Sequence, residues 1–293
     1  MNFKHPMRRK DDIRSPRFRK GMFILPSIFT CGNIAAGYYA ISQTLQGSVT
    51  DAWHYDMAAK AIGIAILFDG LDGRIARMTN TASDFGRELD SLADVIAFGV
   101  APAILAWIWG FHALPPLLWD PELRTKLVHL GAVATFIFLV AGASRLARFN
   151  IQKNPAPSNP GRPGRKYFVG MPIPAGAGMV AAIVHFFNGK PVETWWFSMI
   201  WIAFVVSVGF LMVSTWRFWS AKEIDFRARH RFQIFILLAG FFALAYFFSQ
   251  WVLFLSAMVY MLSGVLARLS FALRRRPTPP VEPYPSASHP DIA

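Results

Sequence analysis

The distribution of apolar and polar residues along the chain predicts a series of membrane-length helices. Long apolar stretches recur from residue 24 to residue 272, each close to the ~20 residues that a helix needs to cross a bilayer core. The runs are continuous and do not alternate with a period of two, which favours helices over a transmembrane β-barrel. We therefore predict an all-α, polytopic transmembrane bundle of about eight helices. The expected spans are 24–46, 56–78, 85–112, 125–149, 170–188, 195–214, 231–248 and 251–271.

Composition agrees with a membrane protein. Of the 293 residues, 54% are hydrophobic and 16% are charged, whereas a soluble domain carries about a quarter charged residues. The single cysteine, Cys31, excludes an intramolecular disulfide and a cysteine-based metal cluster.

Lys and Arg residues gather before the first predicted helix and in every second loop after it. These basic segments are 4–20, 153–166, 217–231 and 274–276. The positive-inside rule then places both termini in the cytosol. The net charge of +13 is divided among several juxtamembrane segments, so topology and the anionic cytosolic leaflet explain it without a nucleic-acid partner.

The chain divides into three parts by composition. Residues 1–22 form a basic tail that is too polar to be the apolar part of a signal peptide, so we expect the first helix to be retained. Residues 23–272 form the transmembrane domain. Residues 273–293 are rich in Pro and Ser and too poor in apolar residues to fold, so they are expected to be disordered.

Four aspartates in the second and third predicted spans are the strongest functional signal. Asp69, Asp72, Asp90 and Asp94 stand at the spacing D-x2-D-G-x2-A-R-x8-G-x3-D-x3-D. Carboxylates near hydrocarbon are costly, so such a group indicates a functional site. Facing one another without a countercharge they would repel, which calls for divalent cations. Ligation by oxygen alone suits Mg²⁺ or Mn²⁺ better than zinc.

Helix periodicity predicts how these residues meet. At 100° per residue, one face of the second span carries Asp69, Asp72, Gly73, Ala76 and Arg77. Folding the chain near position 81 into an antiparallel hairpin brings both aspartate pairs to similar heights. Gly73 and Ala76 would leave room for a bound group, although small residues also allow close helix packing in lipid. Arg77 is expected to contact a phosphate oxygen, or else to reach the membrane interface.

This arrangement predicts a reaction class. A pair of metal ions on phosphoryl oxygens with an arginine nearby is typical of phosphoryl transfer, and one carboxylate could serve as general base. The remote alternative is a cation-coupled membrane transporter. A transporter has no need of Gly73, Ala76 and Arg77 at fixed spacing, and inverted repeats are not visible in the sequence.

The stretch from Asp69 to Asp94 resembles the complete signature of the CDP-alcohol phosphatidyltransferase family, because all its specified positions match. Three further stretches resemble the family's bacterial integral-membrane phosphatidylserine synthases. They are LDSLADVIAFG (89–99), SRLARFN (144–150) and YFVGMPIPAGAG (167–178). The resemblance covers residues 22–270. It implies transfer of a phosphatidyl group from CDP-diacylglycerol to L-serine, giving phosphatidylserine and CMP. Glycerol 3-phosphate, inositol phosphate or choline remain alternative acceptors.

The resemblance also implies a setting and roles for the aspartates. The protein would be a homodimer in the bacterial cytoplasmic membrane, with its site on the cytosolic side. Asp69, Asp72 and Asp90 would hold the metal ions. Asp94 would complete that site and take the proton from the serine hydroxyl.

Substrate-binding residues follow from the same resemblance. Gly73, Arg77 and Ser83 match positions expected to hold cytidine diphosphate, and Ala76 lies beside them. Residues 26–33 are similar to the family's start, which makes Thr30 and Asn33 candidates for the nucleotide pocket, with ordinary helix packing as the alternative. In that stretch Ser27 replaces the usual Asn.

The serine carboxylate needs a cation. Arg145 and Arg148 end the fourth predicted span on the side of the aspartates, and guanidinium groups suit carboxylates. Both arginines could equally be positive-inside anchors.

Overall fold

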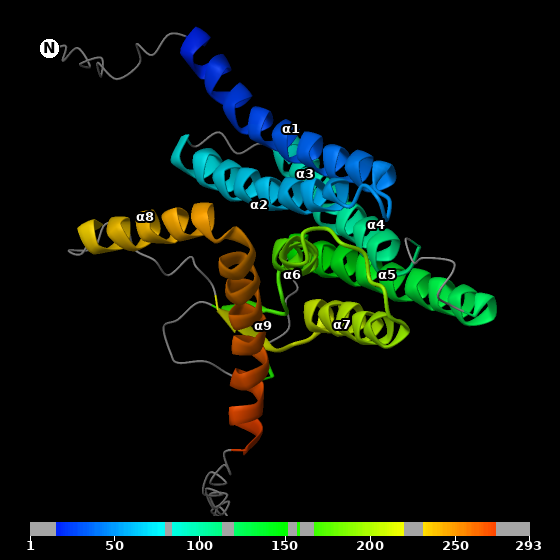
Figure 1. Cartoon of the computed structure of the whole chain (residues 1–293). Helices are drawn as coiled ribbons and strands as arrows, with labels where there is room; N and C mark the ends of the chain where they lie inside the picture. The colour runs from blue at the N-terminus through cyan, green and yellow to red at the C-terminus, as the bar shows by residue number, and fades with distance from the viewer. Residues whose placement is uncertain are drawn as a thin grey trace, which may run out of the picture.

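The computed structural model describes residues 16–79, 84–112, 120–151, 157–158, 167–219 and 231–273. It is built of helices and one small sheet (Figure 1). The helices before the sheet are α1 Pro16–Gln46, α2 Trp53–Thr79, α3 Asp84–Asp94, η1 Val95–Val100, α4 Ala101–Trp107, η2 Ile108–His112 and α5 Pro121–Asn150. The later helices are α6 Ile173–Phe186, α7 Trp195–Val213, α8 Arg231–Phe247 and α9 Ser249–Leu273. Strands β1 Tyr167–Val169 and β2 Arg217–Trp219 pair antiparallel, with Phe168 opposite Phe218.

Each predicted span corresponds to helical structure, but the third span is not one regular α-helix. It contains two π-helical segments, η1 directly after Asp94 and η2 at its end. The N–H of Ala101 donates to the carbonyl of Ile96, five residues earlier. The next residue, Pro102, has no N–H to offer an α-helical ladder. The π-helical segment η1 therefore ends next to the proline, which interrupts the α-helical hydrogen-bond ladder. Single π-helical turns of this kind are frequent at functional sites.

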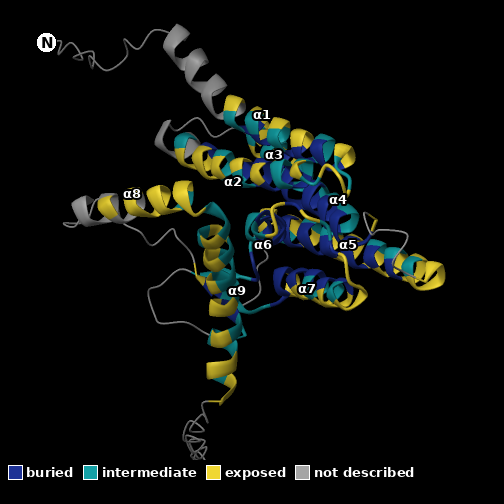
Figure 2. Cartoon of the chain, viewed as in Figure 1, coloured by how far each residue is buried: buried dark blue, intermediate teal, exposed yellow. Residues whose placement is uncertain are grey.

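Among the described residues, four helical segments are long and apolar enough to cross a membrane. They are Asp84–His112, Pro121–Asn150, Trp195–Val213 and Ser249–Leu273. Exposed positions run along the outer faces of the helices (Figure 2). Large apolar residues such as Phe136 and Leu266 are among the exposed ones, as expected where lipid covers the surface. The chain is an integral membrane protein. The count of eight spans and the cytosolic position of the termini stay predictions.

Close backbone contacts position α1 against the helices that carry the aspartates. A Cβ added to Gly37 would lie 2.8 Å from the Cα of Ala97 in η1, so only glycine allows this approach. A Cβ on Gly32 would meet the ring of Phe68 in α2 at 3.2 Å. Since Gly32 and Gly37 flank Asn33 along α1, these contacts hold Asn33 near both aspartate-bearing helices.

The second half of the molecule packs around aromatic side chains. Trp109 and Trp201 are buried and stack edge to face with centroids 5.1 Å apart, and Nε1 of Trp201 donates to the carbonyl of Ala106 at 3.0 Å. These contacts join α7 to the third span. Helix α9 packs against α6 and β2, and α8 leads away from the start of α9 (Figure 1).

Candidate active site

Three of the four signature aspartates converge in the structure. Asp69 comes from α2, while Asp90 and Asp94 lie one turn apart on α3. One carboxylate oxygen from each lies within 4.8 Å of the others. Asp94 is only 8% exposed. The helical hairpin thus gathers acidic groups that the sequence separates by up to 25 positions.

The chemistry of this group suits a divalent cation. Oδ1 of Asp90 is buried and, among the described residues, has no hydrogen-bond partner. An unpaired polar atom inside a protein is costly, and two further carboxylates beside it add to that cost. Hard cations such as Mg²⁺ and Mn²⁺ bind carboxylate oxygens in this way. Asp69, Asp90 and Asp94 therefore fit a metal site.

Asp72 is held differently. It is 6% exposed and accepts a hydrogen bond from Oγ1 of Thr30 in α1. Its charge still acts on Asp69 and on Asp90, so it borders the cluster. The predicted face of four aspartates is therefore three converging carboxylates with a fourth tied to the first helix.

Asn33 makes a similar hydrogen bond to Asp94. Its side chain is fully buried, and Nδ2 donates to Oδ1 of Asp94 at 3.4 Å. Thr30 and Asn33 are three residues apart and share one face of α1. Both residues touch aspartates, a role that the sequence did not reveal. Their spacing at i,i+3 is the signal that could have indicated it.

The predicted diphosphate-binding residues are only partly described. Gly73 is exposed beside Asp72, and Gly86 is half-buried on α3. The backbone of Ala76 and Arg77 belongs to the last turn of α2, but their side chains lie outside the described part of the chain, as does Ser83. A contact between these residues and a nucleotide stays a prediction.

The two arginine candidates occupy different environments. Arg145 is 7% exposed, with its guanidinium carbon 5.4 Å from the ring centroid of Phe149 and 5.9 Å from that of Phe168. The carboxylate of Asp94 interacts electrostatically with it. Arg148 is partly exposed, and its Nη2 donates to the carbonyl of Val213 at the end of α7, at 3.2 Å. Arg145 alone of the two is buried on the side of Asp94.

A further contact joins the arginine-bearing helix to the aspartate-bearing helix. Nδ2 of Asn150 donates to Oγ of Ser91 at 2.8 Å. Ser91 immediately follows Asp90, so this bond ties the end of α5 to the middle of the acidic motif. The sequence analysis did not single out either residue.

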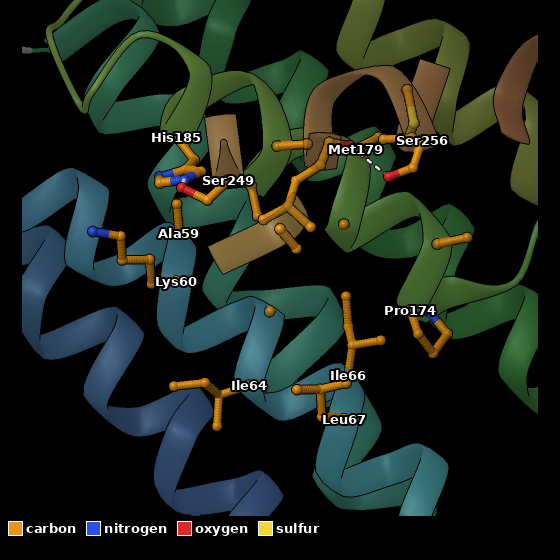
Figure 3. Close-up of a pocket in the computed structure, with 18 of the residues that line it drawn as sticks. Ala59, Lys60, Ile64, Ile66, Leu67, Pro174, Met179, His185, Ser249 and Ser256 are labelled. Carbon is orange, nitrogen blue, oxygen red and sulfur yellow. Dashed lines mark hydrogen bonds between the residues drawn. The ribbon is translucent and has the colours of Figure 1, made fainter. Parts of the chain in front are cut away.

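An apolar cavity of about 780 Å³ lies between α2, α6, α8 and α9 (Figure 3). We call it the apolar cavity. At one end Leu67 lines it, two residues before Asp69, together with Pro172 and Tyr260. The hydroxyl of Tyr260 donates to the carbonyl of Trp219 in β2 at 3.4 Å. The α2 residues that line the cavity, such as Gly63 and Leu67, lie on a different face of that helix from Asp69 and Asp72.

Comparison with known proteins agrees with this site. The model of the family described as CDP-alcohol phosphatidyltransferase matches residues 23–209, well over half of the chain. This chain belongs to the CDP-alcohol phosphatidyltransferase family. A Helicobacter pylori protein named CDP-diacylglycerol–serine O-phosphatidyltransferase is 34% identical over 232 residues, covering 77% of this chain and 82% of that protein. A Mycobacterium bovis protein of the same name is 35% identical over 210 residues, 69% of this chain and 64% of its own length.

The match also shows where the family model lies along this phosphatidyltransferase. The matched range contains the four aspartates, both arginines, Thr30 and Asn33. It ends within α7, so α8 and α9 lie beyond it. The acidic cluster thus lies inside the matched range, whereas two walls of the apolar cavity, α8 and α9, lie outside it.

Proposed function

We propose that this phosphatidyltransferase transfers a phosphatidyl group from CDP-diacylglycerol to the hydroxyl of L-serine, giving phosphatidylserine and CMP in phospholipid biosynthesis. The observation that carries the proposal is the convergence of Asp69, Asp90 and Asp94 in a helical membrane domain. Serine as acceptor is supported by the names of the relatives in two bacterial genera.

Asp69, Asp90 and Asp94 would hold divalent cations, Mg²⁺ or Mn²⁺, with Asp72 beside them. Bound there, a pair of ions would neutralise the diphosphate and favour the departure of CMP. The unpartnered Oδ1 of Asp90 supports this role, since a ligand would satisfy an otherwise costly buried atom.

Asp94 would take the proton of the serine hydroxyl. The serine oxygen then bonds to the lipid-side phosphorus, and the bond from that phosphorus to the oxygen of CMP breaks. Asn33 supports the assignment because its amide donates a hydrogen bond to Oδ1 of Asp94. A general base must be held within reach of its proton, and this contact limits the rotation of the carboxylate.

Arg145 would bind the serine carboxylate. A guanidinium buried to this degree needs an anion, and its charge interacts with Asp94, so serine held by Arg145 would present its hydroxyl near the base. The partly exposed Arg148 would instead stabilise the end of α7 through the Val213 carbonyl.

The apolar cavity would take acyl-chain material from the donor lipid. Its volume of about 780 Å³ falls within the range of ligand sites. Its lining is largely apolar, which suits the chains of a lipid.

The membrane arrangement completes the proposal. The basic segments support eight spans with cytosolic termini, the bacterial cytoplasmic membrane as location and a site on the cytosolic side. Residues 1–22 and 273–293 would flank the transmembrane domain as tails, and the functional unit would be a homodimer. Cysteine accessibility in intact cells, scored for Ser48 and Thr50 replacements in the α1–α2 loop, tests the orientation.

The deciding experiment supplies purified protein with CDP-diacylglycerol, Mg²⁺ or Mn²⁺, and separately serine, glycerol 3-phosphate, inositol phosphate and choline. CMP and the lipid product are both measured, with a chelator as control. Product with serine alone is expected. Product with another alcohol would support the same mechanism with a different acceptor. An absence of metal-dependent CMP with every acceptor would contradict the enzyme assignment.

A further inference from the structure

Three side chains at one end of the apolar cavity form a hydrogen-bonded series of carboxylate, imidazole and hydroxyl. Nδ1 of His185 in α6 lies 2.5 Å from Oδ1 of Asp56 in α2, and Nε2 of His185 lies 2.9 Å from Oγ of Ser249 in α9. His185 and Ser249 both line the cavity. Figure 3 shows their side chains next to each other, close to Lys60. We call Asp56, His185 and Ser249 the Ser249 group.

The hydrogen bonds of His185 determine which of its nitrogens can take up a proton. An ionised carboxylate only accepts hydrogen bonds, so Nδ1 of His185 donates its hydrogen to Asp56. The other oxygen of Asp56, Oδ2, lies 2.7 Å from Nζ of Lys60. In the neutral ring, Nε2 then has a lone pair that accepts the hydrogen of the Ser249 hydroxyl. His185 is therefore placed to act as a general base on Ser249, and Asp56 is placed to orient the imidazole.

The backbone around Ser249 supplies donors for a negatively charged oxygen. Ser249 is the first residue of α9 and follows a break of one residue after α8. The N–H of Val252 donates to the carbonyl of Phe248 at 3.0 Å and begins the helical hydrogen bonds of α9. The N–H groups of Ser249, Gln250 and Trp251 therefore precede these bonds. In hydrolases with a serine at a sharp turn before a helix, the N–H of the next residue serves the oxyanion hole, and Gln250 takes that place here.

The Ser249 group is separate from the acidic cluster. Asp56 precedes Asp69 by 13 positions on α2, which is a rise of about 20 Å. It also stands two turns before Gly63 and thus on the side of α2 that lines the cavity, whereas Asp69 stands on another side. The ester groups of a glycerolipid lie only a few bonds from its phosphate. A donor with its diphosphate at the acidic cluster therefore cannot present an ester to Ser249, and an ester held there belongs to a second molecule.

The Ser249 group lies near the membrane surface. Asn188 and Lys190, in the turn after α6, are exposed, and a charged lysine places this turn at the surface rather than in hydrocarbon. The side-chain amide of Gln250 donates to Oδ1 of Asn188, so the start of α9 lies beside the turn. Ser249, which precedes Gln250, is partly exposed. Water at the surface is therefore within reach of Ser249.

We propose that Asp56, His185 and Ser249 form a nucleophilic triad that hydrolyses carboxylic esters of apolar acyl chains, with the chain in the apolar cavity. The largely apolar lining suits such a chain. Oγ of Ser249 bonds to the carbonyl carbon while its proton passes to Nε2 of His185. The ester C–O bond then breaks, and the alcohol leaves with that proton. Water next attacks the acyl group and gives a proton to Nε2, and Ser249 regains this proton as the fatty acid leaves.

An alkyl fluorophosphonate tests the nucleophile directly. The purified full-length protein is treated with it in dodecyl maltoside and EDTA, which stops the metal-dependent transfer, and adducts are mapped by mass spectrometry. We expect an adduct on Ser249 in the wild type and none at this position in Ser249→Ala. Ser256→Ala is the matched control and should keep the adduct, because Ser256 lines the same cavity from α9 but its Oγ donates to the carbonyl of Leu253 at 2.9 Å. Wild-type protein without an adduct on Ser249 would overturn the proposal and leave the group as a clamp between three helices.

Hydrolysis of p-nitrophenyl octanoate in the same buffer measures turnover. We expect Ser249→Ala to lower kcat/KM about a hundredfold or more, since the nucleophile is lost. Ser256→Ala should stay within about twofold of the wild type. Thermal unfolding in detergent checks that both variants fold. Equal rates for the wild type and Ser249→Ala would overturn the triad, whatever the outcome of the CMP assay.

A pair of glycine variants tests the place of the acyl chain. Gly63 lines the cavity, and within the described structure no atom lies within 4 Å of a Cβ built on it. Gly63→Leu should therefore fill cavity space and lower kcat/KM for p-nitrophenyl octanoate about tenfold or more, while p-nitrophenyl acetate changes by no more than about twofold. Gly240→Leu is the control, because a Cβ at Gly240 also meets nothing within 4 Å in the described structure and Gly240 does not line the cavity. An equal loss with both esters in Gly63→Leu would contradict a chain in the cavity.

Discussion

Nδ2 of Asn33 donates to Oδ1 of Asp94 at 3.4 Å, and this bond joins the first helix to the third across 61 positions of sequence. It is possible because Gly37, one turn further along α1, lets the backbone approach Ala97. The orientation of one carboxylate therefore depends on a glycine in a different helix.

Asn33→Ala should lower kcat about tenfold while changing KM for CDP-diacylglycerol little, because removing a positioning hydrogen bond impairs the base more than the binding of the donor. Steady-state kinetics with both substrates checks this. Thr44→Val is the matched control, since Thr44 is buried on α1 and its hydroxyl donates only to Ala40 within its own helix in the described structure. A rise in KM for the donor alone would instead make Asn33 a nucleotide ligand.

Asp94→Asn should reduce CMP release by about 10²–10⁴-fold, the usual contribution of general base catalysis. Mn²⁺ titration by calorimetry and nucleotide binding are measured on the same variant. Asp69→Asn is expected to lower both CMP release and the affinity for Mn²⁺. Asp69 is a proposed metal ligand, but it has no proposed role in proton transfer. Full CMP release by Asp94→Asn with metal and nucleotide still bound would disprove the assignment of the base.

Arg145→Ala should raise KM for serine about tenfold and affect KM for the lipid less, because a charge-assisted contact to the serine carboxylate is lost. Arg148→Ala serves as the matched variant on the same helix and should change KM for serine by no more than about twofold. Arg145→Lys, which keeps the charge but loses the planar fork, should fall between the two. An equal rise in KM for serine and for the lipid in Arg145→Ala would contradict a contact between Arg145 and the serine carboxylate.

Gly37→Ala should destabilise the protein by about 1–3 kcal/mol, because its new Cβ would lie 2.8 Å from the Cα of Ala97 and backbone atoms cannot turn aside. Thermal unfolding in detergent measures the effect, and activity should fall with it as α1 moves from Asp94. Gly240→Ala provides the comparison, since open space at that position allows the better helix former to be neutral or stabilising. Equal melting temperatures for the two variants would show that α1 and η1 can separate without cost.

Several features of the site are accessible from the sequence because they depend on local periodicity. Apolar runs near the length of a bilayer predict the helices, and the fold at position 81 predicts that Asp69 meets Asp94. Both inferences need only helix geometry and the cost of burying charge. The interruption after Asp94 was not predicted, although Pro102 is a visible cause of irregular helix structure.

The sequence by itself determined that this protein is helical and membrane-embedded with a functional acidic site, because a carboxylate motif in apolar helices has few physical explanations. The family followed from the resemblance of that motif to the family signature. Only the tertiary structure decided which partners those carboxylates have. Thr30 and Asn33 reach Asp72 and Asp94 through the packing of α1. Packing also buries Arg145 and leaves Arg148, one turn further along α5, partly exposed. The apolar cavity likewise has walls from four helices spread over residues 59–260. Such contacts arise from packing between distant segments, and no local pattern in the chain encodes them.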